Sequence, residues 1–264
     1  MDKYIDVNQE IGISKILFPD NQPHIRLTDI QEGDEVAVRC AITSALELLH
    51  LQMVSNALTH KSAHKKILTI PYLMGARYDR IMMDGDSFDL ELIANIINDM
   101  GFEKVRIFDV HSNVALTLIK HSESISNQAL VETYKLNNAV LICPDHGARK
   151  KIEQVFKWNS GFMSIVYCEK NRNPETGKLT LEVLHPEECD NRNCIIVDDI
   201  CDGGATFIEI AKQIKPKHLT LMVSHGIFSK GFTSLEKYFD AIITSNSYKQ
   251  AYEHRLVQLV PLTF

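Results

Sequence analysis

Three aspartates, Asp198, Asp199 and Asp202, lie in a short segment whose residue types suit the binding of a sugar phosphate. The apolar run 194–197 comes before them and is typical of a buried strand, and the small residues 203–206 follow and open a helix-like run. Strand, small polar loop and helix in that order commonly hold a phosphate on backbone N–H groups. Carboxylates accept hydrogen bonds from sugar hydroxyls or hold a hydrated Mg²⁺. Together these residues indicate a site for a ribose phosphate.

Charged side chains also follow other strand-like runs. Lys170 and Arg172 are two cations in a segment that is able to close over a polyphosphate and neutralise its charge. His111 and Asp145 each follow an apolar run, where a neutral imidazole or a carboxylate is placed to bind a divalent cation. Taken singly, each residue has a structural alternative: a solvated charged turn, a hydrogen-bonded histidine, or a helix cap.

Two further segments have the residue types of a nucleotide site. Arg77, Tyr78 and Asp79 follow the strand-like run 67–70, and an arginine suits a phosphate while a tyrosine suits a base. The alternative is a surface loop with an ion pair. The second segment contributes Phe18, Asp20 and Gln22. It is able to stack on and hydrogen-bond a purine, or to form a simple Pro-Asp turn.

Apolar runs alternate with helix-length segments along the chain, which predicts an α/β fold with parallel sheets covered by helices on both faces. One helix is expected over 86–100, with Asp86 as its N-cap and Gly101 just past its end. The stretch 171–178 is expected to form a loop or hairpin. Strands are expected at 67–70, 105–110, 139–143, 163–167, 194–197, 219–224, 241–244 and 256–262.

The composition excludes several classes of protein. The 264 residues are 45% hydrophobic and have a formal net charge of -6, which argues against non-specific binding to nucleic acid. Six scattered cysteines without a CxxC pair indicate reduced thiols rather than a disulfide framework or a zinc site. Neither a signal peptide nor a membrane-spanning run is found, so we expect a cytoplasmic protein with no membrane partner.

Short motifs in a fixed order along nearly the whole chain point to one family. They are Phe18-Pro19-Asp20, Ala76-Arg77-Tyr78-Asp79-Arg80, Phe108-Asp109-Val110-His111, Cys143-Pro144-Asp145-His146-Gly147, Lys170-Asn171-Arg172, Asp198 to Thr206 and Ser224-His225-Gly226-Ile227-Phe228-Ser229. In this order they resemble the motifs of ribose-phosphate diphosphokinases, the phosphoribosyl pyrophosphate synthases. The aspartate loop alone indicates only the wider type I phosphoribosyltransferase fold, whereas the histidine, Lys-x-Arg and Ala-Arg-x-Asp-Arg segments are specific to the synthases.

The resemblance implies a tandem pair of phosphoribosyltransferase-type α/β domains, each a mostly parallel sheet flanked by helices. Residues 1–130 would bind ATP, with 250–264 packing back on them, and residues 131–249 would bind the ribose phosphate. The implied reaction transfers a diphosphate from ATP, with Mg²⁺, to the 1-hydroxyl of ribose 5-phosphate and releases AMP. A homodimer or larger homo-oligomer is also implied.

The resemblance assigns a role to each candidate residue. Lys170 and Arg172 are catalytic, and His111 and Asp145 hold the metal. The residues implied to bind ATP are Phe18, Asp20, Gln22, Arg77, Tyr78, Asp79 and His111. Those implied to bind the ribose phosphate are Asp198, Asp199, Asp202, Gly203, Gly204, Ala205 and Thr206.

The chain also departs from the family pattern. Gln22 replaces a glutamate, Tyr78 a glutamine and Asn171 an arginine, and Gly-Gly-Ala-Thr at 203–206 replaces Thr-Gly-Gly-Thr, which removes a hydroxyl from the phosphate loop. The apolar and acidic segment 81–86 replaces a basic one, which bears on regulation and assembly. Three alternatives therefore stay open: the same chemistry on a larger ester such as ADP-ribose, a phosphoribosyltransferase, and a non-catalytic regulatory subunit.

Overall fold

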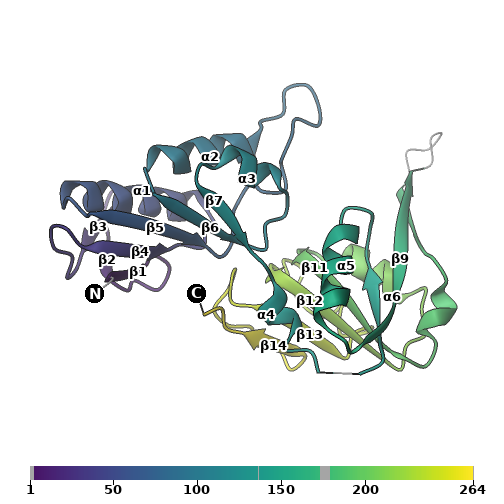
Figure 1. The fold of residues 1–264 in the computed structure, drawn as a ribbon. Coiled ribbons are helices and arrows are strands. Elements are labelled where there is room, and N and C mark those ends of the chain that lie inside the picture. The colour runs from purple at the N-terminus through teal and green to yellow at the C-terminus, as the bar shows by residue number, and fades with distance from the viewer. Residues whose placement is uncertain (1–2, 136, 173–178, 264) are drawn as a thin grey trace. The chain divides into compact units, whose positions relative to one another are not determined.

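The computed structural model describes residues 3–135, 137–172 and 179–263, with the side chains of residues 171, 172 and 179 excepted. The chain divides into two compact units, Met1–Ser126 and Asn127–Thr263 (Figure 1). The sequence analysis placed this boundary at 130/131. Each unit is built around its own sheet, and the two are described separately.

The first unit contains a five-stranded parallel sheet in the order β1-β4-β5-β6-β7, and a separate two-stranded hairpin, β2-β3. Its elements are β1 (Lys3–Asp6), β2 (Ile13–Leu17), β3 (Pro23–Leu27), β4 (Glu35–Arg39), α1 (Ala45–His60), β5 (Lys65–Ile70), α2 (Asp89–Asp99), β6 (Lys104–Phe108), α3 (Val114–Leu118) and β7 (Ser122–Ile125). The strands expected at 67–70 and 105–110 are confirmed as β5 and β6. The carboxyl ends of these neighbouring parallel strands lie at one edge of the sheet, where ligands bind in open α/β folds.

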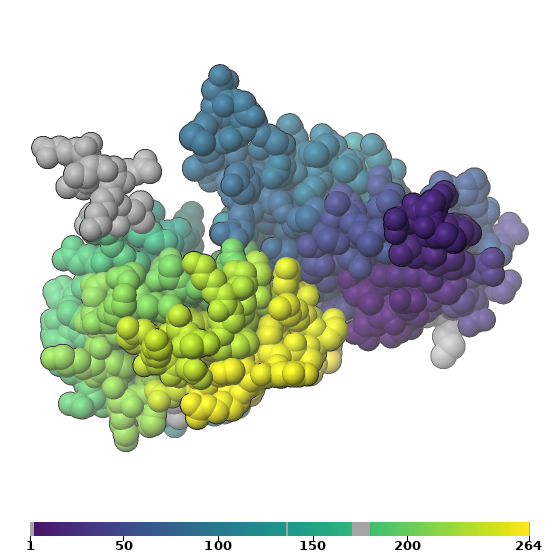
Figure 2. All heavy atoms as spheres, turned by 180° about the vertical axis from the view of Figure 1, so that it is seen from behind, coloured from purple at the N-terminus to yellow at the C-terminus, as the bar shows by residue number. Residues whose placement is uncertain are grey.

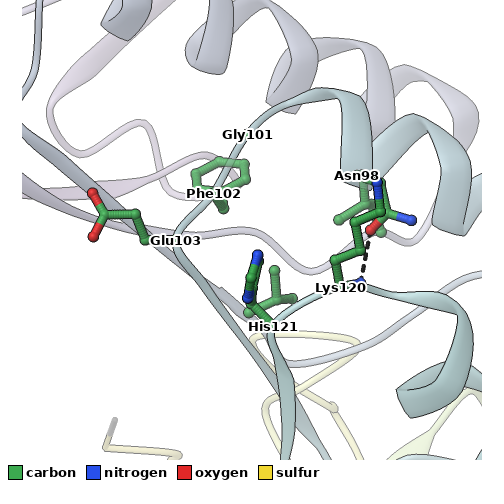
Figure 3. Close-up of a pocket in the computed structure, with 8 residues that line it drawn as sticks. Asn98, Gly101, Phe102, Glu103, Lys120 and His121 are labelled. Atoms are coloured by element: carbon green, nitrogen blue, oxygen red, sulfur yellow. Dashed lines mark hydrogen bonds between the residues drawn. The ribbon is translucent and has the colours of Figure 1, made fainter.

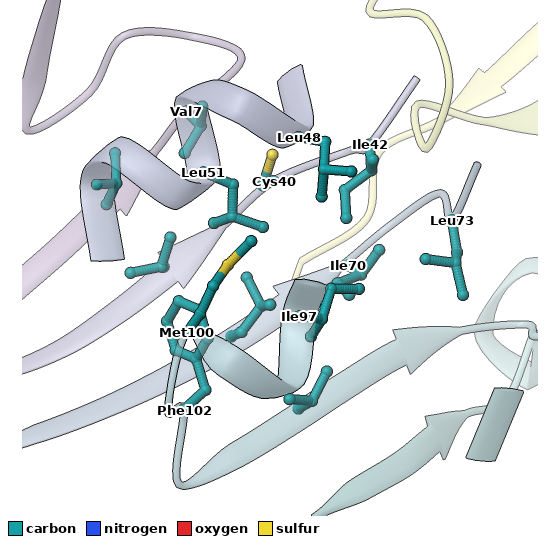
Figure 4. Packing of buried hydrophobic residues seen from close by; sticks show 14 of the residues in the cluster. Val7, Cys40, Ile42, Leu48, Leu51, Ile70, Leu73, Ile97, Met100 and Phe102 are labelled. Carbon is teal, nitrogen blue, oxygen red and sulfur yellow. The ribbon is translucent and has the colours of Figure 1, made fainter. Parts of the chain in front are cut away.

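Helices α1 and α2 pack together over this sheet. Leu48 and Leu51 of α1 and Ile97 of α2 surround Ile70 of β5 in a buried apolar cluster (Figure 4). Strand β6 alternates, with Val105 and Ile107 buried and Lys104 and Arg106 partly exposed and paired with Glu123. This alternation shows that β6 has one apolar face toward the core and one polar face.

Helix α2 starts three residues later than expected. Its first residue is Asp89, and the Asp86 carboxylate instead accepts a hydrogen bond from the Met83 backbone N–H at 2.9 Å, closing a turn in the preceding loop. The helix ends as expected, since Met100 is its C-cap and Gly101 follows with a φ of +67°. The prediction that Asp86 is the N-cap is therefore wrong, because Phe88 is the N-cap and no side chain caps the helix there.

The second unit contains a seven-stranded sheet in the order β10-β9-β8-β11-β12-β13-β14. All neighbours are parallel except β9 and β10, which form an antiparallel hairpin. Its elements are α4 (Gln128–Val131), β8 (Ala139–Cys143), α5 (Arg149–Trp158), β9 (Phe162–Arg172), β10 (Leu179–Val183), a 3₁₀ turn (Pro186–Cys189), β11 (Asn193–Cys201), α6 (Ala205–Ala211), β12 (His218–Gly226), β13 (Ala241–Ser245) and β14 (Val257–Val260). All of the strands expected in this half are confirmed.

The central strands of this sheet are buried on both faces. Alternate residues of β8 and β11 contribute to two separate apolar clusters, one with Ile142 and Ile196 and one with Leu141 and Ile195. Helix α6 covers the first cluster, and α4 and α5 cover the second. This is the arrangement that near-continuous apolar strands predict. All six cysteines are free and buried, as the scattered pattern indicated.

Two segments differ from their expected positions. Residues 257–260, placed with the first domain by the sequence analysis, form β14 and pair with β13 in the second sheet. Strand β9 extends to Arg172, so the Lys170 segment belongs to the strand rather than following it. The expected hairpin is present as β9 and β10, and its residues 173–178 lie outside the described part of the chain.

Candidate functional site

The carboxyl end of β11 carries the aspartate pair. Asp199 is buried, and its backbone N–H donates to Asp198 Oδ1 at 2.9 Å. Burial of the Asp198 carboxyl raises its pKa well above the usual range, and the Asp199 carboxylate beside it raises this pKa further. The Lys151 ammonium opposes this shift only in part. Asp198 therefore holds its proton to higher pH than an ordinary aspartate does.

The loop that follows is held by the segment after β12. The backbone N–H groups of Ile227 and Phe228 both donate to the Cys201 carbonyl, at 2.9 and 3.1 Å, and Ser229 N–H donates to the Asp202 carbonyl at 3.2 Å. The Ser229 hydroxyl also donates to Asp202 Oδ1. Asp202 is thus fixed by its backbone and its side chain, which sets the course of the loop.

Gly204 is the one loop position where glycine is required by backbone shape. Its φ is +76°, and a Cβ added there would lie 2.9 Å from Leu235 Cδ2. Ala205 and Thr206 follow as the first two residues of α6. Asp198 and Asp199 thus lie at the end of β11, and residues 202–206 follow directly as the loop and the start of α6.

Lys170 and Asp145 meet in the same unit. Lys170 Nζ donates to Asp145 Oδ2 at 2.6 Å, and both side chains are about one third exposed, at 34% and 31%. The other carboxylate oxygen, Oδ1, accepts the Ala148 backbone N–H at 3.1 Å and so caps the turn before α5. Asp145 follows β8, the sheet neighbour of β11, which places this pair and the aspartate loop at the same edge. The side chain of Arg172 lies outside the described part of the structure.

The first unit gathers Asp79, Ser112 and His111 beyond the ends of β5 and β6. Arg80 donates to both Asp79 oxygens, at 2.7 and 3.0 Å. These hydrogen bonds, with one from Ser112 and the charges of Arg80 and His111, lower the pKa of Asp79 to about 2 despite some desolvation. Asp79 is therefore a fixed anion near neutral pH, next to the histidine that the sequence analysis selected.

A pocket of about 620 Å³ lies beside this cluster, between the loop after β5 and the two large helices. Arg77 and Tyr78 line it, together with Leu92 and Ile93 of α2. The mostly apolar lining with one guanidinium suits a flat ring that carries an anionic group. The loop 79–88 projects from the unit beyond this pocket and appears blue in Figure 2.

Phe18, Asp20 and Gln22 lie elsewhere in the first unit. They form the turn of the β2-β3 hairpin, where the Gln22 backbone N–H donates to Asp20 Oδ1 at 3.1 Å. Gln22 borders a hollow against Leu49 and Met53 of α1, whereas Arg77 lines the other pocket. The structure therefore does not bring the hairpin turn together with Arg77 and Asp79.

A smaller pocket, of about 260 Å³, lies away from all of these residues. Asn98, Glu103, Lys120 and His121 contribute to its lining (Figure 3). It opens where β6 and β7 begin, which is the edge of the sheet opposite to His111. This position separates it from the candidate site.

Comparisons with known proteins point in one direction. No family model matches the chain. Ribose-phosphate pyrophosphokinase from Mycoplasmopsis pulmonis is 24% identical over 268 residues, which cover 95% of this chain and 82% of that protein. The enzyme of the same name from Thermococcus kodakarensis is 26% identical over 229 residues. These cover 81% of this chain and 77% of that protein.

A solved structure extends the match to the fold. Phosphoribosylpyrophosphate synthetase from Mycobacterium smegmatis superposes with a TM-score of 0.83 at 16% identity, over 98% of this chain and 94% of that one. The chain is a divergent relative of the ribose-phosphate pyrophosphokinases. It shares the fold of two phosphoribosyltransferase-type domains, and its relatives are enzymes. Among the described residues, no helix is long and apolar enough to cross a membrane.

Two residues of the candidate site, Ser112 and Lys230, were not predicted from the sequence. Ser112 was passed over beside His111, although a serine next to a strand-end histidine is a visible signal. Lys230 lies across Gly203, with its Cδ and Cε 3.3 Å from the position of a Cβ added at that glycine. No local pattern reveals this contact, since it depends on the pairing of β11 with β12.

Replacing Asp198 by asparagine is expected to stabilise the pyrophosphokinase relative at pH 7. A raised pKa means that the folded protein binds the proton more tightly than the unfolded chain does. The wild type therefore loses stability as the pH rises from about 4, the unfolded value, toward the folded pKa. Asparagine retains the Oδ1 acceptor for Asp199 N–H and carries no charge.

Thermal unfolding of Asp198→Asn and wild type at pH 4 and pH 7 measures this effect. Each kcal/mol recovered shifts the Tm by about 2–4 °C at this chain length. The gain should be present at pH 7 and shrink toward pH 4. The exposed Asp190→Asn serves as the control. An equal gain at both pH values would contradict the assignment to charge.

Proposed function

We propose that this chain transfers a diphosphate group from ATP to the 1-hydroxyl of ribose 5-phosphate. The hydroxyl oxygen attacks the β-phosphorus of ATP, the bond between that phosphorus and the oxygen bridging to the α-phosphate breaks, and AMP leaves. The products are phosphoribosyl pyrophosphate and AMP. The observation that carries the proposal is the 2.6 Å contact of Lys170 with Asp145 at the sheet edge that also holds the aspartate loop. The match to named pyrophosphokinases over most of the chain supports it.

In this proposal the second unit binds the acceptor. Asp198 and Asp199 accept hydrogen bonds from the ribose 2- and 3-hydroxyls, and residues 202–206 surround the 5-phosphate. Lys170 neutralises the charge that develops on the transferred group, and Arg172 has the same role by sequence position. Positioning and charge neutralisation dominate such transfers, which agrees with a site that presents no obvious general base.

The first unit binds ATP in the same proposal. Arg77 contacts the phosphates, and Tyr78 stacks on the adenine in the pocket of about 620 Å³. Asp79 is a fixed anion beside Ser112 and His111, and it holds these groups in place for the nucleotide. The role in adenine binding that the resemblance implies for Phe18, Asp20 and Gln22 stays a prediction, and these residues do not line this pocket.

Mg²⁺ is proposed as the cofactor, with His111 and Asp145 as direct or water-mediated ligands. The described residues contain no cluster of three metal-ligating side chains, but Mg²⁺ in phosphoryl transfer is usually held by one or two carboxylates and the substrate phosphates. The Asp145 carboxylate fits this role, because its Oδ2 already attracts the Lys170 ammonium. The bound ion would supply neutralisation of the ATP phosphates. A homo-oligomer and a cytoplasmic location remain predictions.

A second acceptor is favoured by one observation. Gly203 has no side chain and its φ does not require glycine, so the loop lacks a hydroxyl here and has the flexible stem of Lys230 beside it instead. A flexible side chain is able to move aside for an esterified 5-phosphate, and ADP-ribose is the second candidate. The two candidates share the chemistry and differ only in what is attached to the acceptor phosphate.

Incubation with ATP, Mg²⁺ and either ribose 5-phosphate or ADP-ribose tests the proposal. We expect AMP and a product that is heavier by one diphosphate, with the higher kcat/KM identifying the acceptor. Release of AMP without a nucleobase excludes a phosphoribosyltransferase. Absence of AMP with both acceptors would overturn the proposal and favour a non-catalytic subunit.

A further inference from the structure

The stem of Lys230 lies beside Gly203. A Cβ added at Gly203 would lie 3.3 Å from both Cδ and Cε of Lys230 and 3.6 Å from its Cγ. The two distances of 3.3 Å are slightly tighter than an ordinary contact between carbon atoms, so the stem of the lysine lies against the loop. The backbone of Gly203 does not need glycine for its own conformation. A side chain at 203 would therefore displace the stem of Lys230 by a few tenths of an ångström.

The backbone around Lys230 is held rigidly against the loop. The three N–H groups at 227–229 donate to the Cys201 and Asp202 carbonyls, so the residue before Lys230 is fixed to the strand end. Phe228 has a φ of 47°, an unfavourable value for a bulky residue. It is held there by Phe232, whose ring centroid is 4.8 Å away, and by Tyr252, edge-on at 5.5 Å. Strain that is stabilised by packing at such a place commonly marks a functional position.

The charge of Lys230 is not used elsewhere in the described part of the chain. Lys230 is exposed and takes part in no ion pair among the described residues. Asp199 and Asp202 are carboxylates of the same segment, and their negative charge opposes the binding of an anion there. An ammonium group beside Gly203 offsets that negative charge. In the family pattern, a threonine hydroxyl stands at this position.

We infer that Lys230 binds the phosphate group on C5 of the acceptor sugar, in place of the hydroxyl missing at position 203. The inference rests on the proposed function for the identity of the acceptor. A lysine ammonium binds phosphate as a point charge on a flexible stem, so it accepts either a monoester or an ester that carries a further group. Lys230 therefore sets the affinity for the acceptor and leaves ATP binding and the chemical step unchanged.

Kinetics of Lys230→Met test this inference, since methionine retains much of the stem and removes the charge. We expect the KM for the preferred acceptor to rise about 10- to 100-fold, the range for losing a hydrogen bond to a charged group. The KM for ATP should remain within about 3-fold of wild type. Lys230→Arg should retain most of the affinity, and the exposed Lys237→Met, which removes the same charge nearby, should resemble wild type. An unchanged acceptor KM in Lys230→Met would overturn the inference.

A double variant tests directly whether Lys230 replaces a threonine hydroxyl at position 203. Adding Gly203→Thr to Lys230→Met restores the loop hydroxyl, and we expect it to recover part of the lost acceptor affinity. In the wild-type background, Gly203→Thr has to displace the lysine stem and should raise the acceptor KM. Equal effects of Gly203→Thr in both backgrounds would contradict a shared site.

A binding measurement separates this inference from the proposed function. Inorganic phosphate should raise the Tm of the wild type and of Lys237→Met, and raise that of Lys230→Met much less. This shift requires no turnover. Lys230-dependent phosphate binding in a protein that releases no AMP would refute the proposed function alone. Turnover with a phosphate response that is unaltered in Lys230→Met would refute the role of Lys230 alone.

Discussion

Replacing Lys170 by methionine is expected to lower the turnover number by about 10²- to 10³-fold, the usual cost of removing one group that stabilises charge in a transition state. Lys170 Nζ lies 2.6 Å from Asp145 Oδ2, at the sheet edge that also holds the aspartate loop. Methionine retains a stem of similar length and removes the ammonium group. In the proposed function Lys170 acts on the transferred group, so the loss should fall on kcat and much less on the KM for either substrate.

Steady-state kinetics of AMP release, with ATP and the acceptor varied in turn, provide the measurement. Lys212→Met is a matched control, since it removes the same charge from the same unit at an exposed position that pairs only with Glu209. We expect Lys212→Met to retain wild-type kcat. A kcat for Lys170→Met within about threefold of wild type would remove Lys170 from the mechanism.

The second half of the fold could be predicted well because its signals are local. Strand β8 matches its expected range of 139–143 because five consecutive buried apolar residues leave no other choice. Strand β9 was expected to end near Tyr167, but it continues through Lys170. The polar residues at the end of β9 pair with β10 through their backbones, which does not require apolar side chains. The apolar run in the sequence therefore ends before the strand does.

The first 64 residues were not predicted beyond a single turn. Helix α1 has exposed leucines at 46 and 49 as well as buried ones at 48 and 51, so its apolar residues form no single stripe. Strand β1 has only four residues, and it is stabilised by a partner strand that is distant in sequence. Such elements depend on tertiary pairing, which a periodicity argument does not detect.

The candidate site also has one part that the sequence predicts and one part that it does not. The loop 198–206 is continuous in sequence, so its residues had to lie together. The contact between Lys170 and Asp145 and the approach of Lys230 to Gly203 both join different strands, and only the order of strands in the sheet determines them. The sequence motifs contain Lys170 and Asp145 but do not show that the two side chains are in contact. Lys230 directly follows the motif that ends at Ser229 and belongs to none of the motifs.

The largest stability effect is expected at the buried ion pair of the first unit. Asp6 and Arg39 are 1% and 3% exposed, lie opposite each other in the β1–β4 register, and are joined by a 2.9 Å contact between Asp6 Oδ2 and Arg39 Nη1. Arg39 Nη2 is buried without a hydrogen-bond partner, so Asp6 is the group that compensates this charge. Asp6→Asn would leave the guanidinium unpaired, and we expect a loss of about 3–5 kcal/mol in the free energy of unfolding.

Denaturant unfolding of five proteins tests this origin of the effect: the wild type, Asp6→Asn, Arg39→Met, the double variant and Glu123→Gln. Asparagine retains the Oδ1 acceptor for the backbone N–H groups of Asn8 and Gln9, so Asp6→Asn removes charge and leaves these bonds in place. The double variant Asp6→Asn with Arg39→Met removes both charges and should recover a large share of the loss, because neither ion is then buried alone. Glu123→Gln, at an exposed ion pair of the same sheet, should unfold like the wild type. If the double variant is as unstable as the sum of its single variants, the two side chains act independently and the buried charge is not the cause.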